Sequence, residues 1–330
     1  MTEEATTRFL HVANGTCATR LIESAGIPGR RSIWADPLDD GPVPGGLSDG
    51  ELLDVRARHL AGKSKPGEVD PVNDLRAWRA VIEHQQAYDE LVLWFEHDLF
   101  DQLNLVQILT WIRDRLDAAA AVSLICIGAF PGRPGFKGLG ELTAGELAPL
   151  LDTRQRVTAA QYALADQAWR AFREPSPMAL DDLRQADTSA LPFLAAALTR
   201  FLEEYPWTGD GLSRSERRLL QLAGDGPIGL AAAFPRMHDG EAAYYITDLS
   251  FAALVETLSR AAPPLISVAG ATAGFRHASM TLTEVGRDVL TGRRDRVATC
   301  GIDRWLGGVH LQPGADLWRW DGERRRMTRD

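Results

Sequence analysis

The chain has 330 residues, of which 45% are hydrophobic and 25% are charged, so it is long enough for about two or three globular domains. Its net charge of −9 argues against a general nucleic-acid coat, because binding to phosphates depends on Lys and Arg. No apolar run is long enough to cross a membrane, the first residues show no signal-peptide pattern, and three widely spaced cysteines do not suggest a disulfide framework. We therefore expect a cytoplasmic protein without a membrane partner.

The first 142 residues alternate short apolar strands with helices. A strand is predicted over 8–15 (RFLHVANG), followed by a helix over 17–25. A second strand over 32–36 leads into PLDDGPVPGG, a loop rich in Pro, Gly and Asp. Further elements are predicted in the order helix, helix, strand, helix and strand, over 48–60, 72–88, 91–95, 103–116 and 122–127. Continuous apolar strands separated by helices predict the α/β class, with an N-terminal Rossmann-like parallel sheet over 1–142.

The rest of the chain divides by pattern into three parts. Residues 143–208 carry helical spacing and are predicted to form a helical linking region. Residues 209–298 begin with a helix that has a Ser213-x-x-Glu216 capping box. This helix is the first of three, and a strand, a loop, a strand and a helix follow them, which is the order of a winged-helix-like domain. Residues 299–330, rich in Trp and Gly, are predicted to form a strand pair that packs on the body.

The helix of the winged-helix-like part that would read DNA is poorly suited to that task. It spans 248–261 and carries Asp248 and Glu256 before its first basic residue, Arg260. Helices that read DNA usually present Arg, Lys, Asn or Gln. Nucleic-acid binding is therefore not the expected role, although arginines elsewhere in this part keep it open.

Polar residues follow every predicted strand of the N-terminal domain. In open parallel sheets, ligands bind beyond the carboxyl ends of the strands. Buried carboxylates and histidines cost free energy unless they are paired, ligated or hydrogen-bonded, so their clustering suggests a use. The candidate catalytic residues are His11, Asp36, His97, Asp98 and Asp101.

The tripeptide Glu96-His97-Asp98 is the candidate metal site. Its carboxylate and imidazole groups suit a divalent ion such as Mg²⁺, Mn²⁺ or Zn²⁺, and with Asp101 they also suit acid–base work. The alternative is structural, with Asp98 capping the next helix and Glu96 facing solvent.

Candidate ligand-binding residues lie in the turns beside these groups. Asn14, Gly15 and Thr16 precede a helix whose N–H groups could bind an anion, or they form a tight turn beside a core His11. Asp40 belongs to a loop that is either a lid or a rigid turn. Two further candidates are Gln102 and Lys137, and the lysine lies in a Gly-rich loop where solvation is the alternative. Neither a dinucleotide fingerprint nor a Walker loop is present.

Three segments carry a family resemblance: HVANGTCATRLIESAGIPG, WADPLDDGPVP and LWFEHDLFDQLNLVQIL. Through them the chain resembles a bacterial family known only by a domain-of-unknown-function label. The resemblance extends over most of the chain and implies that the N-terminal motifs form one unit. The family supplies no established activity. Its first motif commonly reads Asn-Gly-Asp, whereas this chain has Thr16 at the third position.

Three functions remain as hypotheses. The first is an enzyme, a hydrolase or group transferase with a divalent metal ion as candidate cofactor, which binds a polar or phosphate-bearing small molecule at the strand ends. The second is an interaction module that uses the winged helix and the Trp-rich tail. The third is a ligand-sensing DNA-binding regulator.

Overall fold

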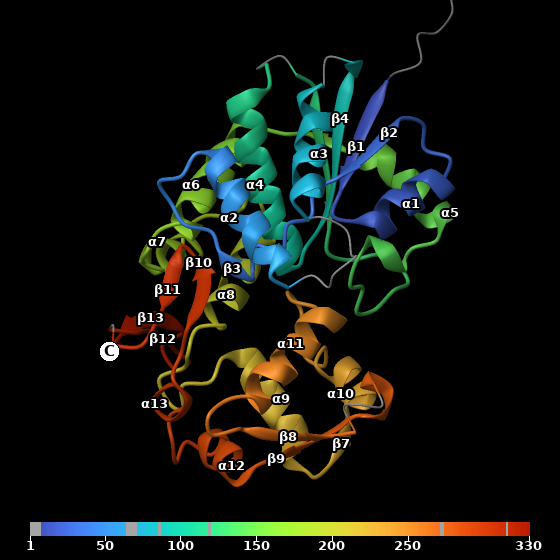
Figure 1. The fold of residues 1–330 in the computed structure, drawn as a ribbon. Helices are drawn as coiled ribbons and strands as arrows, with labels where there is room; N and C mark the ends of the chain where they lie inside the picture. The colour runs from blue at the N-terminus through green and yellow to red at the C-terminus, as the bar shows by residue number, and fades with distance from the viewer. Residues whose placement is uncertain (1–7, 64–70, 85–86, 118–119, 271–273, 315) are drawn as a thin grey trace, which may run out of the picture.

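A computed structural model of the chain describes residues 8–63, 71–84, 87–117, 120–270, 274–314 and 316–330. Its largest sheet has five strands in the order β2-β1-β4-β5-β6 (Figure 1). Strands β1 (Phe9–Ala13), β2 (Arg30–Ile33), β4 (Glu90–Glu96) and β5 (Val122–Ile127) are parallel. The edge strand β6 (Gln155–Arg156), which was not expected, is antiparallel to β5. The predicted α/β class and a mostly parallel sheet are confirmed.

Helices cover both faces of this sheet, which explains why its central strands are continuous apolar runs. Leu10 and Val12 of β1 belong to a core on one face, and Phe9 and Ala13 to a core on the other. The first face is covered by α2 (Asp49–Ala61), α3 (Pro71–Glu83), α4 (Leu99–Arg115) and α6 (Ala159–Phe172). The second is covered by α1 (Thr16–Ser24) and α5 (Ala144–Leu147) (Figure 1).

Helix α4 begins four residues earlier than the sequence pattern indicated. The Asp98 side chain accepts a hydrogen bond from the Asp101 N–H and so caps the helix before Leu99. The helix is buried on all sides from Leu99 to Ile112 apart from Phe100, so its first turn lacks the apolar–polar alternation that marks a surface helix. Helix α3 ends at Glu83, whereas the sequence predicted 88; residues 85–86 lie outside the described residues.

The region after β5 is mostly helical, as predicted. Two short 3₁₀ turns, Leu139–Glu141 and Ala148–Thr153, flank α5. Helices α7 (Met178–Leu183) and α8 (Leu194–Leu202) follow α6, and residues from all three join the core beside α4.

The next unit has a hydrophobic core of its own, formed by residues between Leu212 and Val289. It contains three helices, α9 (Arg214–Gly224), α10 (Leu230–Arg236) and α11 (Asp248–Ser259), and then α12 (Glu284–Leu290). Its antiparallel sheet has the order β7-β9-β8, from Ile228–Gly229, Ser279–Leu282 and Ile266–Ala269. The predicted Ser213–Glu216 capping box is present. Strand β7 and a 3₁₀ turn over Phe275–His277 add to the expected order of elements among the described residues of this unit.

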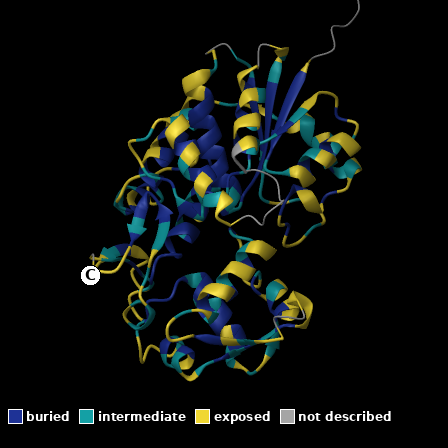
Figure 2. Cartoon of the chain, in the orientation of Figure 1, coloured by how far each residue is buried: buried dark blue, intermediate teal, exposed yellow. Residues whose placement is uncertain are grey.

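The C-terminal residues form α13 (Arg296–Cys300) and two hairpins, β10 (Arg304–Gly307) with β11 (Val309–Leu311), and β12 (Trp318–Asp321) with β13 (Arg326–Arg329). Strand β10 also pairs in parallel with β3 (Gly41–Pro42), which lies inside the PLDDGPVPGG loop. Trp320 and Met327 belong to the same hydrophobic core as α6, α7 and α8, and the Met327 N–H donates to the Asp181 carboxylate of α7, so the tail packs on the body. Figure 2 shows the buried strands near the C-terminus in dark blue. Among the helices described, none has the length and apolar character that crossing a membrane would require.

Candidate functional site

The candidate site lies at the carboxyl ends of β1 and β4. These strands are neighbours, and the sheet continues from β1 to β2 on one side and from β4 to β5 on the other. Such a reversal of strand order opens a crevice at the strand ends, where α/β proteins bind ligands. Asn14 follows β1, Glu96 ends β4, and Asp98 and Asp101 form the start of α4.

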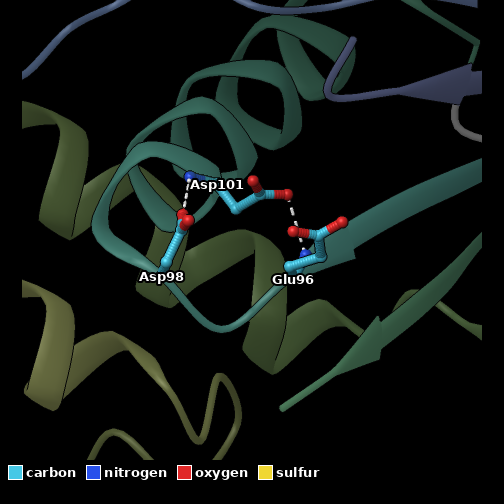
Figure 3. A group of neighbouring side chains, drawn as sticks. All are labelled: Glu96, Asp98 and Asp101. Carbon is cyan, nitrogen blue, oxygen red and sulfur yellow. Dashed lines mark hydrogen bonds between the residues drawn. The ribbon is translucent and has the colours of Figure 1, made fainter. Parts of the chain in front are cut away.

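Three carboxylates meet at this point. One oxygen from each of Glu96, Asp98 and Asp101 lies within 4.8 Å of the others (Figure 3). The Asp98 carboxylate accepts a hydrogen bond from the Asp101 N–H at 2.9 Å. The Asp101 carboxylate in turn accepts one from the Glu96 N–H at 2.8 Å. The turn between β4 and α4 therefore holds the three carboxylates together.

Neighbouring segments fix the orientation of the cluster. The Asn14 side-chain amide donates to Asp101 Oδ2 at 2.8 Å. The Leu139 N–H donates to Glu96 Oε1 at 2.6 Å. Gly138 leaves the room that this approach needs, because a Cβ there would lie 2.1 Å from Glu96 Oε2. Strand β1 and the Gly-rich loop thus both position the carboxylates.

The cluster carries more negative charge than its surroundings compensate. Glu96 and Asp101 are 6% and 1% exposed. In the described part of the chain, no Lys or Arg nitrogen lies within 4.0 Å of the three carboxylates. Burial, reinforced by Asp98, raises the pKa of Glu96 to about 7, and burial raises the pKa of Asp98 to about 6. Burial and the two neighbouring carboxylates also raise the pKa of Asp101 well above its usual value. All three carboxylates can therefore be ionised together only when a cation compensates their charge.

His97 does not belong to the carboxylate cluster, and the predicted metal set Glu96-His97-Asp98 needs correction. Its ring packs against Phe193 and Tyr245, with Nε2 3.5 Å from the Tyr245 hydroxyl. Burial lowers the pKa of His97, which favours the neutral ring. Consecutive residues that leave a strand point in different directions, so Asp101 takes the place that the sequence suggested for His97.

His11 and Asp36 do not join the cluster either. His11 lies within β1, where Nδ1 accepts a hydrogen bond from Trp94 Nε1 at 3.1 Å and Nε2 lies 3.0 Å from the Pro28 carbonyl oxygen. This is the core histidine that the sequence left as an alternative. The Asp36 carboxylate is buried against the Arg56 guanidinium at 2.7 Å. Of the candidate catalytic residues, only Asp98 and Asp101 therefore belong to the carboxylate cluster.

The predicted ligand-binding residues have separate locations. Gln102 is buried behind the cluster and donates to the Glu96 carbonyl oxygen at 2.6 Å. Asp40 pairs with His59 and Lys63 of the segment around the end of α2. Lys137 is exposed, with Nζ 5.8 Å from the centre of the Tyr245 ring.

Gly15 and Thr16 begin α1, as predicted, and no side chain caps this end of the helix. The N–H groups of its first turn therefore have no partner within the helix. Thr16 and Cys17 are exposed, and a Cβ on Gly140 would lie 3.9 Å from Cys17 Cβ. The start of α1 is thus close to the loop that orients Glu96.

Sequence reasoning missed two contributors to the site. In the Gly-rich loop the sequence points to Lys137 as the ligand-binding residue. The structure shows instead that Gly138 leaves room for the Glu96 carboxylate. Tyr245 reaches His97 from the unit that begins at α9, and the Leu99 N–H donates to the Ala243 carbonyl oxygen at 2.7 Å. No local pattern in the sequence indicates a contact between segments about 145 residues apart.

We compared the sequence with protein-family models and with curated proteins, and neither comparison gave a match. The family resemblance expected from the three N-terminal segments therefore stays a prediction.

Proposed function

We propose that the protein is a metal-dependent hydrolase or group transferase that acts on a phosphate-bearing small molecule at the carboxyl ends of β1 and β4. The observation that carries this proposal is the group of three carboxylates, two of them deeply buried, without a cationic partner among the described residues. Buried like charges are unfavourable unless a proton or a metal ion compensates them.

The donor set favours a hard divalent cation. Glu96, Asp98 and Asp101 offer only oxygen ligands, which suit Mg²⁺, Mn²⁺ or Ca²⁺ better than Zn²⁺. Asn14 and the Leu139 N–H would act as the outer hydrogen-bonding groups that orient the ligands of a metal. When bound, such an ion polarises a phosphoryl oxygen and offsets the charge that develops during transfer.

The start of α1 supplies the second half of the proposed site. Its uncapped N–H groups and its helix dipole favour an anion such as a phosphate. Asn14 connects this end to the carboxylates, because it directly precedes Gly15 and donates to Asp101. A phosphate held there would lie beside a cation bound by the carboxylates. The open parallel sheet, Rossmann-like in outline, would then use the usual place for such a ligand.

Metal binding tests this proposal directly. We expect Mn²⁺, followed by electron paramagnetic resonance, to bind the protein at one site and Mg²⁺ to compete for it. Glu96→Gln should weaken Mn²⁺ binding at least about tenfold, because it removes a charged ligand. The control Glu83→Gln changes an exposed carboxylate on α3 and should bind Mn²⁺ like the wild type.

Activity is tested in a second step. A panel of nucleotides and phosphomonoesters is incubated with Mg²⁺ or Mn²⁺, and the release of phosphate is measured. Turnover that needs the metal and disappears in Glu96→Gln but not in Glu83→Gln is the expected result. If the wild type binds no divalent ion, or if Glu96→Gln binds Mn²⁺ as tightly as the wild type, the proposal is refuted.

A second proposal concerns the unit from α9 to α12, which we infer to be a winged helix used for contact rather than for reading DNA. Its α11 is the third helix of the unit, which is the recognition helix in the winged-helix order, and its Asp248 and Glu256 are exposed. The same unit contacts the N-terminal domain through Ala243 and Tyr245. We expect no salt-dependent binding to duplex DNA in a fluorescence anisotropy titration; tight binding that weakens with salt would refute this inference.

A further inference from the structure

A cavity of about 420 Å³ lies between the N-terminal domain and the unit from α9 to α12. The loop that contains Asp39 forms part of one wall, and α11 forms part of the opposite wall. The segment at the start of β10 contributes a third side. The volume is in the range of small-molecule sites, which commonly lie between domains.

Most charged side chains that line this cavity are already paired within the protein. The pairs, all with N–O distances of 3.3 Å or less, are Asp40 with Lys63, Glu204 with Arg304, and Glu216 with Arg296. A ligand could compete for these groups only by breaking existing ion pairs. They therefore do not determine the charge that the cavity selects.

Asp39 is the exception. In the regions that the structure describes, no side chain and no backbone N–H of another residue donates a hydrogen bond to its carboxylate. Burial, followed by the charge of Asp40, raises the pKa of Asp39 to about 6. Burial, and after it the charge of Asp39, raises the pKa of the Tyr244 phenol. At a pH above 7 the Asp39 carboxylate is thus anionic, and in the described ranges of the chain it forms no ion pair within 4.0 Å.

The remaining lining combines the hydroxyl side chains of Ser213, Ser215, Ser250 and Thr257 with an apolar and aromatic part. In the apolar part, Ile246 and Leu254 come from the unit from α9 to α12, and Ile302 precedes β10. The rings of Tyr244 and Trp305 also line this part. An apolar body is favoured against such a surface, and aromatic rings also attract cations. An inorganic cation would gain only one free carboxylate here and would lose most of its hydration.

We propose that this cavity binds a small organic ammonium ion, with the amine on the Asp39 carboxylate and an apolar body against Ile246, Leu254 and Tyr244. Asp39 is not one of the three clustered carboxylates, although its charge contributes to the raised pKa of Asp98 after burial, and the amine site does not depend on the chemistry proposed for the cluster. The amine supplies the missing counter-charge, and the hydrocarbon body leaves water for an apolar wall.

The test compares three probes of similar shape, phenethylammonium, phenethyl alcohol and 3-phenylpropionate, by isothermal titration calorimetry at about pH 8, where Asp39 is ionised. Phenethylammonium should bind saturably and at least about tenfold more tightly than either other probe, because only it can pair with the carboxylate. Equal binding of the three probes, or no saturable binding of the amine, overturns the proposal. Mg²⁺ as a fourth probe should not displace the amine, and displacement also counts against an organic ligand.

Two variants place the amine in the cavity. Asp39→Asn keeps the shape of the side chain and should weaken phenethylammonium binding at least about tenfold. Asp303→Asn is the control, because this carboxylate is at the edge of the same cavity but is exposed and paired with His310. If Asp39→Asn fails to fold, Ala253→Trp on the exposed side of α11 fills the cavity instead and should abolish binding. Asp303→Asn should bind phenethylammonium like the wild type, whereas unchanged affinity in Asp39→Asn or in Ala253→Trp overturns the site.

The same titration separates this site from the proposed metal centre. Glu96→Gln should bind phenethylammonium with the affinity of the wild type. A loss of amine binding in Glu96→Gln, with normal binding in Asp39→Asn, would place the amine at the carboxylate cluster and overturn the assignment to the cavity.

Discussion

Replacing Gly138 by alanine should disturb the carboxylate cluster without touching a carboxylate. The backbone at Gly138 is extended, with φ of 168°, so alanine meets no conformational barrier there. The new Cβ would, however, lie 2.1 Å from Glu96 Oε2. Normal contact requires the two atoms to separate by more than about 1 Å, and the surroundings are too closely packed to yield without loss.

The expected cost follows from the contact that must break. Moving Glu96 lengthens its 2.6 Å hydrogen bond from the Leu139 N–H beyond a useful distance. A buried hydrogen bond to a charged group contributes about 1.5–3 kcal/mol, and overpacking adds about 1 kcal/mol or more. We therefore expect Gly138→Ala to lose about 3 kcal/mol of stability in urea denaturation. Mn²⁺ affinity should fall in the same variant, because a ligand has been displaced.

Gly140→Ala is the matched control. It lies in the same loop, and its new Cβ would have no neighbour closer than 3.9 Å. It should unfold at the urea concentration of the wild type and bind Mn²⁺ normally. If Gly138→Ala behaves like Gly140→Ala in both measurements, Glu96 does not occupy the position on which the site is built.

Three further predictions concern buried polar groups. Arg56→Met should lower the free energy of unfolding in urea by about 3–5 kcal/mol, because Asp36 is left buried without its partner. Arg76→Met, at an exposed ion pair, should lower it by less than about 1 kcal/mol. Similar losses in the two variants would refute this prediction. His11→Leu should lower the unfolding temperature by leaving the Trp94 indole N–H unpaired, but Mn²⁺ affinity should stay unchanged, and a lost metal site would place His11 in it. Burial tends to raise the pKa of Glu204, but the charges of its arginine partners lower it to about 2. The ionised Glu204 therefore stabilises the folded protein fully above about pH 4.5, and this contribution is lost as the pH falls toward 2. The urea concentration at the unfolding midpoint, measured between about pH 4.5 and 2, should fall less for Glu204→Gln than for the wild type. If both midpoints fall in parallel with pH, this prediction is contradicted.

The sequence was a good guide where local chemistry decides the structure. Apolar runs bounded by turn residues indicated β1, β4 and β5 nearly to the residue, and the Ser213–Glu216 capping box marked the start of α9. Asp98 and Asp101 were correctly placed at the strand ends, because a strand that enters a helix leaves little freedom for the residues between them.

The sequence was a poor guide where distant segments decide. Whether His11 faced the site or the core depended on Trp94, a partner 83 residues away, and the role of Asp36 depended on Arg56. His97 and Asp101 could not be ranked as members of the cluster from spacing alone, because the turn between β4 and α4 sets their directions. The cavity could not be foreseen, because its walls come from three separate parts of the chain.

The pairing of β3 with β10 affects the order in which the protein can mature during synthesis. The PLDDGPVPGG loop is made early, yet Val43 donates its N–H to the Gly307 carbonyl oxygen, and Leu306 is the register partner of Gly41. The ribosome must synthesise more than 260 further residues before β3 can pair with β10. Until then the Asp39 carboxylate lacks the wall that the segment before β10 supplies, so a nascent or C-terminally clipped chain would have an incomplete cavity.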